Sequence, residues 1–132
     1  MTDTYHGKTV LKVAERPAFA ELAILWTLRD AGWDGIWIDW YRGKYRTDYW
    51  DASPVELAEE PAKLLERIYA LLGSRSGAWD IFCWRGGEVL FTEAKRRGHD
   101  CVRALQLSFL DAALAAGLSI QSFLIVEWTL RE

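Results

Sequence analysis

The Gly86-Gly87 pair constrains the fold of this chain more than any other feature of its sequence. It separates two apolar, β-prone runs, Asp80–Trp84 and Val89–Lys95. Because glycine adopts positive φ angles without steric cost, a Gly-Gly pair between such runs predicts a two-residue β-hairpin turn. Pairing outward from this turn places Asp80 directly opposite Glu93. The sequence therefore predicts an antiparallel hairpin whose register is set by the turn.

The end of the hairpin away from the turn gathers three charged side chains. Directly opposed residues point to the same face with Cβ atoms roughly 5 Å apart, so Asp80 and Glu93 are neighbours. Lys95 lies two residues beyond Glu93 and shares that face. Two adjacent carboxylates repel each other unless a cation lies between them. In one interpretation that cation is Lys95 alone, in a solvated salt bridge. In the other, Mg²⁺ or Mn²⁺, which prefer oxygen ligands, binds there as well.

The order of these residues resembles a known active-site motif. Asp80, a strand, a turn and a strand carrying Glu93-x-Lys95 are similar to the motif of the PD-(D/E)XK nuclease superfamily. Within it, the chain resembles the small VRR-NUC and Holliday-junction-resolvase-like branch. Residues 103–117 follow with a glutamine, a leucine-rich face and a closing glycine. The resemblance covers roughly residues 74–128 and one earlier helix, and it departs from the family at Trp79, where the family has a proline that binds no ligand.

The resemblance implies an α/β fold with a restriction-endonuclease-like αβββαβ core. It implies a nuclease that hydrolyses phosphodiester bonds in DNA with Mg²⁺ or Mn²⁺ as its cofactor. Its substrates would include structured or branched DNA. Asp80, Glu93 and the backbone carbonyl of Ala94 would hold the metal. Lys95 would orient the attacking water or lower its pKa, and Gln106 would face the site, although a core glutamine bonded to backbone is the alternative.

A helix near the N-terminus is the second part of the resemblance. Pro17 precedes strong helix formers from Ala18 to Ala31, which predicts a helix that starts near the proline and ends at Gly32. In the resembled superfamily such a helix often lends a glutamate to the metal site. Glu21 fits that role and Glu15 is the second choice, whereas a solvated helix carboxylate is the alternative interpretation of Glu21.

Hydrophobic periodicity predicts the remaining elements of a single domain spanning residues 1–132. We expect residues 1–8 to be loose, and we expect a mixed sheet flanked by helices. The last helix is apolar nearly all round, which is typical of a helix buried between layers. The predicted elements are a strand at Thr9–Val13, a strand near 35–41, a helix within Pro54–Leu72, a helix near Asp100–Ala116 and a strand at Ser122–Trp128.

Cationic side chains near these elements are candidates for contacts with nucleic acid. Arginine and lysine alternate with tyrosines in residues 41–49, a pattern that can hold phosphates and stack on bases, although a surface loop whose aromatics pack on the domain fits it better. Cations that follow the motif could clamp the backbone around a cleaved phosphate, or face solvent in a turn. The candidates are Arg42, Lys44, Arg46, Arg75, Arg96, Arg97 and Arg103.

Bulk composition limits the function classes. A net charge of −3 argues against a surface that coats nucleic acid without specificity. No apolar run reaches the ~20 residues of a membrane span, so we expect a cytoplasmic protein with no membrane contact. Because one domain carries one site, cutting both strands of DNA would need a homodimer, with tryptophans and tyrosines as its expected interface. The rival interpretations are a non-catalytic binding or assembly module with this fold, and a nuclease for single strands or RNA.

Overall fold

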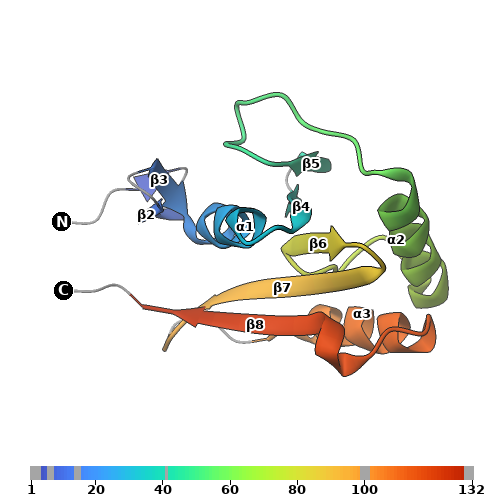
Figure 1. The fold of residues 1–132 in the computed structure, drawn as a ribbon. Coiled ribbons are helices and arrows are strands. Elements are labelled where there is room, and N and C mark those ends of the chain that lie inside the picture. Colours follow the sequence, from blue (N-terminus) through green and yellow to red (C-terminus); the bar gives the residue numbers. More distant parts are fainter. Residues whose placement is uncertain (1–3, 6–7, 14–15, 41, 99–101, 130–132) are drawn as a thin grey trace.

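A five-stranded mixed sheet forms the centre of the molecule (Figure 1). The structure is a computed structural model that describes residues 4–5, 8–13, 16–40, 42–98 and 102–129, with side chains described from Phe19 onward. The strands lie in the order β5-β4-β6-β7-β8. Their bounds are Asp34–Asp39 for β4, Lys44–Arg46 for β5, Ile81–Arg85 for β6, Glu88–Arg96 for β7 and Phe123–Trp128 for β8.

The first four strands in this order are each antiparallel to the next, and β6 and β7 form the expected hairpin. Strand β8 runs parallel to β7. Parallel neighbours need a crossover, which here consists of α3 (Ala104–Ala115) and the short 3-10 helix η1 (Ile120–Ser122). The fold is therefore α/β, as predicted.

Helices cover both faces of this sheet (Figure 1). On one face, α1 (Ala20–Asp30) packs with Phe19 on side chains of β4 and β6, which include Trp37, Ile81 and Cys83. The other face is covered by α2 (Glu59–Leu72) and α3. The core there consists of the alternate strand residues, together with inward side chains of the two helices: Ile36, Ile38, Phe82, Phe91, Leu65, Ile68, Tyr69, Phe109, Ala112 and Ala113.

The register of the hairpin confirms the prediction from the turn. Arg85 pairs with Glu88 next to the turn, and the ladder continues without a bulge to Ile81 and Thr92. Gly86 adopts a φ of 59°, a conformation that glycine enters at no steric cost. Gly87 does not need a positive φ. One glycine of the pair therefore sets the turn.

The N-terminal region differs from the prediction. Strands β1 (Thr4–Tyr5), β2 (Lys8–Val13) and β3 (Arg16–Phe19) form a separate antiparallel sheet, so part of the segment expected to be loose is paired. Pro17 lies in β3 opposite Lys12 rather than in the first turn of a helix. Because β3 is an edge strand of that sheet, the missing N–H of proline is tolerated there. Helix α1 begins only at Ala20.

The second helix lies within the predicted range Pro54–Leu72. It begins at Glu59 and ends at Leu72. The preceding Val55 instead forms an isolated β-bridge with Tyr45. Gly73 closes the helix with a φ of 83°, as expected for a left-handed cap. No helix in the described part of the chain has the length and apolar character to cross a membrane.

The last helix is not buried on all sides, which corrects the prediction. Phe109, Ala112 and Ala113 face the sheet, but Leu105 is 61% exposed and Leu107 is 50% exposed. The apolar composition therefore reflects surface as well as core. The predicted start near Asp100 lies outside the described residues, and α3 begins at Ala104.

The stability of this core should depend on Phe91, which is fully buried. Its ring stacks on Phe82 with centroids 4.4 Å apart and on Phe123 at 5.4 Å, and it meets the edge of Phe109 at 5.2 Å. We expect Phe91→Ala to lower the free energy of unfolding by about 3–5 kcal/mol, because it removes a large side chain and leaves a cavity.

Urea titration followed by circular dichroism measures this loss. The control is Leu71→Ala on α2, whose side chain is 54% exposed and whose loss should cost about 0.5 kcal/mol. Equal losses in the two variants would contradict this assignment of the core.

Candidate active site

Strands β6 and β7 separate at the position of Asp80 and Glu93. The regular ladder ends at Ile81 and Thr92. Beyond it, the backbone N–H of Asp80 donates a 2.8 Å hydrogen bond to Oε1 of the Glu93 side chain. The carbonyl of Asp80 accepts a 2.8 Å hydrogen bond from the N–H of Ile38 in β4. The Glu93 carboxylate thus satisfies backbone at the point where the two strands part.

Glu93 and Lys95 form a buried ion pair. Glu93 is fully buried, and Lys95 is 8% exposed. The Nζ atom of Lys95 lies 3.1 Å from Oε2 of Glu93. The same ammonium donates a 3.1 Å hydrogen bond to Oε1 of Gln106 on α3. Both side chains therefore face the α3 side of the sheet, as the alternation from Phe91 requires.

Gln106 joins the ion pair to the first turn of α3. Its Oε1 atom also accepts a 2.9 Å hydrogen bond from the backbone N–H of Arg103, the N-cap residue. The indole Nε1 of Trp79 donates to the backbone carbonyl of Gln106 at 3.1 Å. The start of this helix is consequently fixed to β7 and to the segment that leads into β6.

The segment leading into β6 packs tightly against the same turn of α3. Gly77 has a φ of 77°, which L-residues with a side chain rarely adopt. A Cβ atom there would lie 2.3 Å from the carbonyl oxygen of Leu105. Glycine is therefore required by both backbone conformation and space. Its role could not be read from the sequence, because Leu105 is distant in the chain.

One oxygen of Glu93 remains incompletely satisfied. Within the part of the chain that the structure describes, Oε2 is buried and makes no hydrogen bond, although it forms the ion pair with Lys95. A buried charge is costly unless it is both paired and hydrogen-bonded. The ammonium of Lys95, 3.1 Å away, is the described cation at this oxygen. The arrangement suits a structural salt bridge and also leaves a lone pair for a second cation.

The backbone carbonyl of Ala94 has a suitable direction. In a hairpin with a two-residue turn, the flanking residues Arg85 and Glu88 exchange their backbone hydrogen bonds. Counting in steps of two along β7, Thr92 and then Ala94 direct their backbone groups toward β6. Since β6 starts at Ile81, the carbonyl of Ala94 points into the gap between the separating strands. The carboxylates of Asp80 and Glu93 and this carbonyl are oxygen donors of the kind that Mg²⁺ or Mn²⁺ prefers, and they are the residues that could hold such an ion.

The structure does not gather a third acidic side chain here. Glu21 lies half-buried in the first turn of α1, which covers the face of the sheet opposite α3. Among the residues described, no three His, Cys, Asp or Glu side chains are grouped to hold a metal ion. Glu15 lies outside the described residues. A metal bound by Asp80 and Glu93 would therefore need water or substrate oxygens to complete its coordination.

The cations around β5 differ in burial. Arg46 is 5% exposed, and its Nε atom donates to Asp39 at 2.8 Å. Arg42 lies 3.3 Å from the same carboxylate and stacks on Trp50 with its guanidinium carbon 4.3 Å from the ring centre. Lys44 is exposed. Arg46 is therefore a buried structural residue. Of these three cations, Arg42 and Lys44 are the ones that carry charge at the surface.

The remaining candidate cations differ in their environments. Arg75 forms an ion pair with Glu66 at 2.6 Å and stacks on Tyr69. Arg96 is half-buried over the ring of Trp128, at 5.5 Å from its centre. Arg97 is exposed immediately after β7, and Arg103 is exposed at the start of α3. Arg97 thus follows the strand that carries Lys95, and Arg103 directly precedes the helix that carries Gln106.

Cys83 is not a nucleophile candidate. It is fully buried on the α1 face, and burial raises the pKa of its thiol to about 12. At neutral pH it remains a protonated core side chain. Cys101 lies outside the described residues.

Two contributors to the site were not predicted from the sequence. Trp79 departs from the family pattern and binds no ligand there, yet its indole anchors α3. The backbone N–H of Arg103 shares an acceptor with Lys95. The spacing of Arg103 and Gln106, three residues apart before an apolar run, was the available signal for the second contact, because a glutamine at the third helical position commonly caps the helix start.

Comparison with known proteins adds no identification. No model of a protein family matches this sequence, and neither a curated protein nor a solved structure matches it.

The contact between Gly77 and Leu105 can be tested with two glycine variants. Gly73 has nearly the same backbone conformation, with a φ of 83°, but open space where a Cβ would lie. We expect Gly73→Ala to lower the free energy of unfolding by about 1–2 kcal/mol through backbone strain alone. Gly77→Ala should lower it further, by about 1–3 kcal/mol more, because the new methyl group collides with α3. Urea denaturation measures both values, and equal losses would rule out the close approach.

Proposed function

We propose that this protein is a divalent-metal-dependent nuclease that hydrolyses phosphodiester bonds in DNA. The observation that carries the proposal is the buried Glu93–Lys95 pair at the point where β6 and β7 separate beside Asp80. Its carboxylate retains an oxygen without a hydrogen bond within the described chain. An apolar pair would fill this space at lower cost if the residues served only to stabilise the fold.

The order of elements supports a restriction-endonuclease-like core. Helix α1, strands β4, β6 and β7, helix α3 and strand β8 follow one another as αβββαβ. Strand β5 and helix α2 form an insertion between β4 and β6. Asp80 directly precedes the second strand of that order, and Glu93 and Lys95 lie on the third, as the motif requires.

The proposed metal ligands are Asp80, Glu93 and the carbonyl of Ala94. When bound there, Mg²⁺ or Mn²⁺ would polarise the scissile phosphate and offset the charge that develops on it. Because the protein supplies few ligands, coordination positions remain for water and a phosphate oxygen, which is usual for Mg²⁺.

Lys95 and Gln106 position the remaining chemistry. The ammonium group has three N–H donors, and one of them is used by Gln106. Its place between Glu93 and Gln106 leaves it able to donate to an attacking water or to a phosphate oxygen. Gln106 is a positioning residue in this proposal, because its Oε1 already binds both Lys95 and the N–H of Arg103.

Contacts to the DNA backbone would be local. With a net charge of −3, the protein has no excess of cations to attract DNA over its whole surface. Arg97 and Arg103 are exposed next to the site, and Arg96 is half-buried beside it. These residues would bind phosphates on either side of the cleaved bond, with branched or otherwise structured DNA as the expected substrate.

A second candidate function is a non-catalytic binding module. The complete burial of Glu93 favours it, because a carboxylate that only satisfies the N–H of Asp80 and the charge of Lys95 would look similar. The two candidates differ in whether the site binds metal. Binding of Mn²⁺ to the folded state alone, at 100 times its dissociation constant, would stabilise the protein by about 2.7 kcal/mol.

Cleavage of defined DNA tests the nuclease directly. We expect wild-type protein with Mg²⁺ or Mn²⁺ to cut at least one of labelled duplex, single-stranded, flap and four-way-junction DNA. Glu93→Gln keeps the size of the side chain and should lower the rate by at least about 100-fold, since it removes the ligand charge. Glu88→Gln is the matched control, an exposed glutamate of the same strand, and should cut normally.

Thermal unfolding with Mn²⁺ separates the two candidates. The nuclease should gain several degrees in melting temperature, and Glu93→Gln should gain much less. A protein that neither cuts any of the four substrates nor responds to Mn²⁺ would be the binding module. Cleavage of single strands or RNA in preference to the DNA structures would revise the substrate and leave the chemistry in place.

A further inference from the structure

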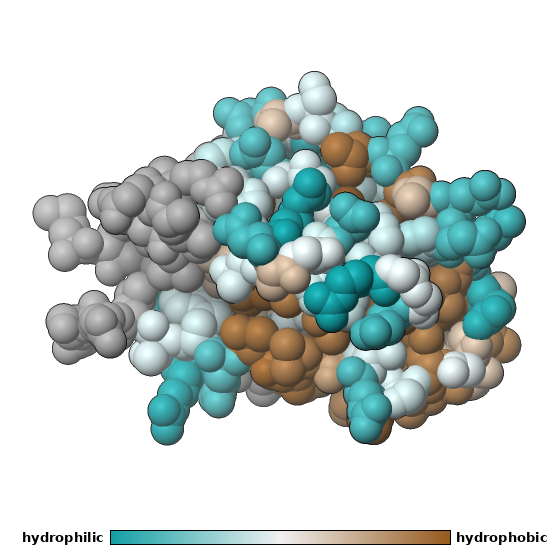
Figure 2. Space-filling view, in the orientation of Figure 1, coloured by the Kyte–Doolittle hydropathy of each residue, from teal (hydrophilic) through white to brown (hydrophobic). Residues whose placement is uncertain are grey.

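Strand β8 carries one charged residue, Glu127, and the register of the sheet places it beside the candidate site. Strands β7 and β8 are parallel, and Glu127 lies directly opposite Lys95. The two strands are about 4.8 Å apart, as neighbours in a sheet are. The other residues of the strand, in the sequence FLIVEW, are apolar. Figure 2 shows hydrophobic surface in the lower half of the view, where β8 and α3 lie in Figure 1. A carboxylate on this strand therefore differs from its surroundings.

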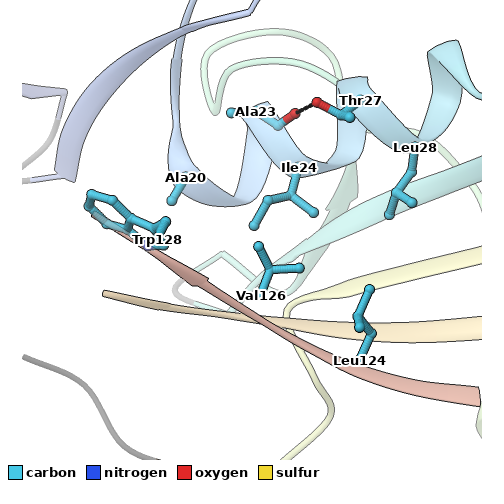
Figure 3. A pocket seen from close by; sticks show the side chains of 8 residues that line it. All are labelled: Ala20, Ala23, Ile24, Thr27, Leu28, Leu124, Val126 and Trp128. Atoms are coloured by element: carbon cyan, nitrogen blue, oxygen red, sulfur yellow. Dashed lines mark hydrogen bonds between the residues drawn. The ribbon is translucent and has the colours of Figure 1, made fainter. Parts of the chain in front are cut away.

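The side chains of β8 alternate between the two faces of the sheet. Figure 3 shows three of them pointing from the strand toward α1, where they line an apolar groove: Leu124, Val126 and Trp128. Because successive side chains of a strand point to opposite faces, Glu127 projects on the α3 side. Lys95 projects on that side too, since its ammonium bonds Gln106 of α3. Glu127 thus shares the face of the candidate site.

The sheet around Glu127 is open to solvent on this face. Glu127 is exposed, and Ile125, two residues before it on the same face, is 46% exposed. The other side of β7 is closed, because Ala78 and Trp79, which lead into β6, are 2% and 3% exposed. Lys95 itself is 8% exposed. The side of β8 is therefore the open approach by which water reaches the Lys95 ammonium.

Hydrolysis of a phosphodiester needs an acceptor for the proton of the attacking water, and the side chains assigned to the candidate site do not supply one. The ammonium of Lys95 donates hydrogen bonds and has no lone pair. Oε1 of Gln106 already accepts from Lys95 and from the N–H of Arg103, and an amide is not a base. Asp80 and Glu93 are the proposed metal ligands. A carboxylate outside that ligand set would supply the missing group.

We propose that Glu127 is the catalytic base of this site, an inference that rests on the proposed nuclease function. The Lys95 ammonium has three N–H donors and faces Glu93 and Gln106, which leaves a donor to hold a water. Glu127 accepts a proton from that water as the water oxygen forms its bond to phosphorus. The bond from phosphorus to the leaving oxygen breaks, and this oxygen takes a proton from solvent.

Two other roles fit Glu127 less well. As a third metal ligand it would belong to a group of acidic side chains, but among the described residues no such group of three is placed to hold a metal ion. It lies across from Lys95 on the next strand. As a structural residue it would have a partner, whereas among the described side chains its carboxylate forms neither an ion pair nor a hydrogen bond. We therefore expect its replacement to leave the fold intact.

Cleavage kinetics on labelled duplex, single-stranded, flap and four-way-junction DNA test the assignment. Glu127→Gln should lower kcat at least about 100-fold with little change in KM, as expected for loss of a general base. Mn²⁺ should raise its melting temperature as much as that of wild type, because the ligands remain, whereas Glu93→Gln should lose this gain. Added formate should restore part of the activity of Glu127→Ala, since a small carboxylate fits the vacated position. The matched control is Glu88→Gln, an exposed glutamate of β7, which should cut at the wild-type rate.

Circular dichroism confirms that each variant is folded before its rate is interpreted. A Glu127→Gln variant that cuts at the wild-type rate would overturn the assignment and leave the nuclease in place. Loss of the Mn²⁺ effect in this variant would also overturn it, because Glu127 would then be a ligand. The same holds if formate does not restore activity to Glu127→Ala. A wild type that cuts none of the four substrates would contradict the proposed function itself, and the assignment of the base with it.

Discussion

The arrangement of the candidate site depends on one buried carboxylate. Glu93 bonds the backbone of Asp80 where β6 and β7 part, and its other oxygen faces the ammonium of Lys95. If that carboxylate were absent, the N–H of Asp80 would lose its acceptor and Lys95 would be left with a buried, unpaired charge. A buried ion pair seldom stabilises a fold more than an apolar pair would, which is consistent with the metal-binding role that we propose for it.

The surrounding fold holds this charge in place through contacts at three levels. Phe91, two residues before Glu93 on the same face, is stacked between aromatic rings of β6 and β8. The first turn of α3 is fixed by Trp79 and by the close approach of Gly77. Gln106 then connects that turn to Lys95. Rigid support of this kind is what a metal or phosphate site needs, because small displacements of the reacting groups cost rate.

Local sequence determined the parts of this structure that depend on local geometry. The turn at Gly86 fixed the hairpin register, and the period of two then placed Glu93 and Lys95 on one face. Features set by distant contacts could not be predicted in this way. Pro17 lies in an edge strand because β2 pairs with it, and Arg46 is buried because Asp39 lies beside it. In α3 the apolar sequence did not show which face is buried, because the exposed side of this helix carries leucines as the buried side carries apolar residues.

The central claim is that Asp80 and Glu93 bind a divalent metal ion at the opening between β6 and β7. Anomalous diffraction from crystals grown with Mn²⁺, recorded at the manganese absorption edge, tests this most directly. The account predicts a peak within coordinating distance of both carboxylates and of the Ala94 carbonyl, with Lys95 beside it. Well-ordered density that shows the Glu93–Lys95 pair intact and no manganese at this position would contradict it.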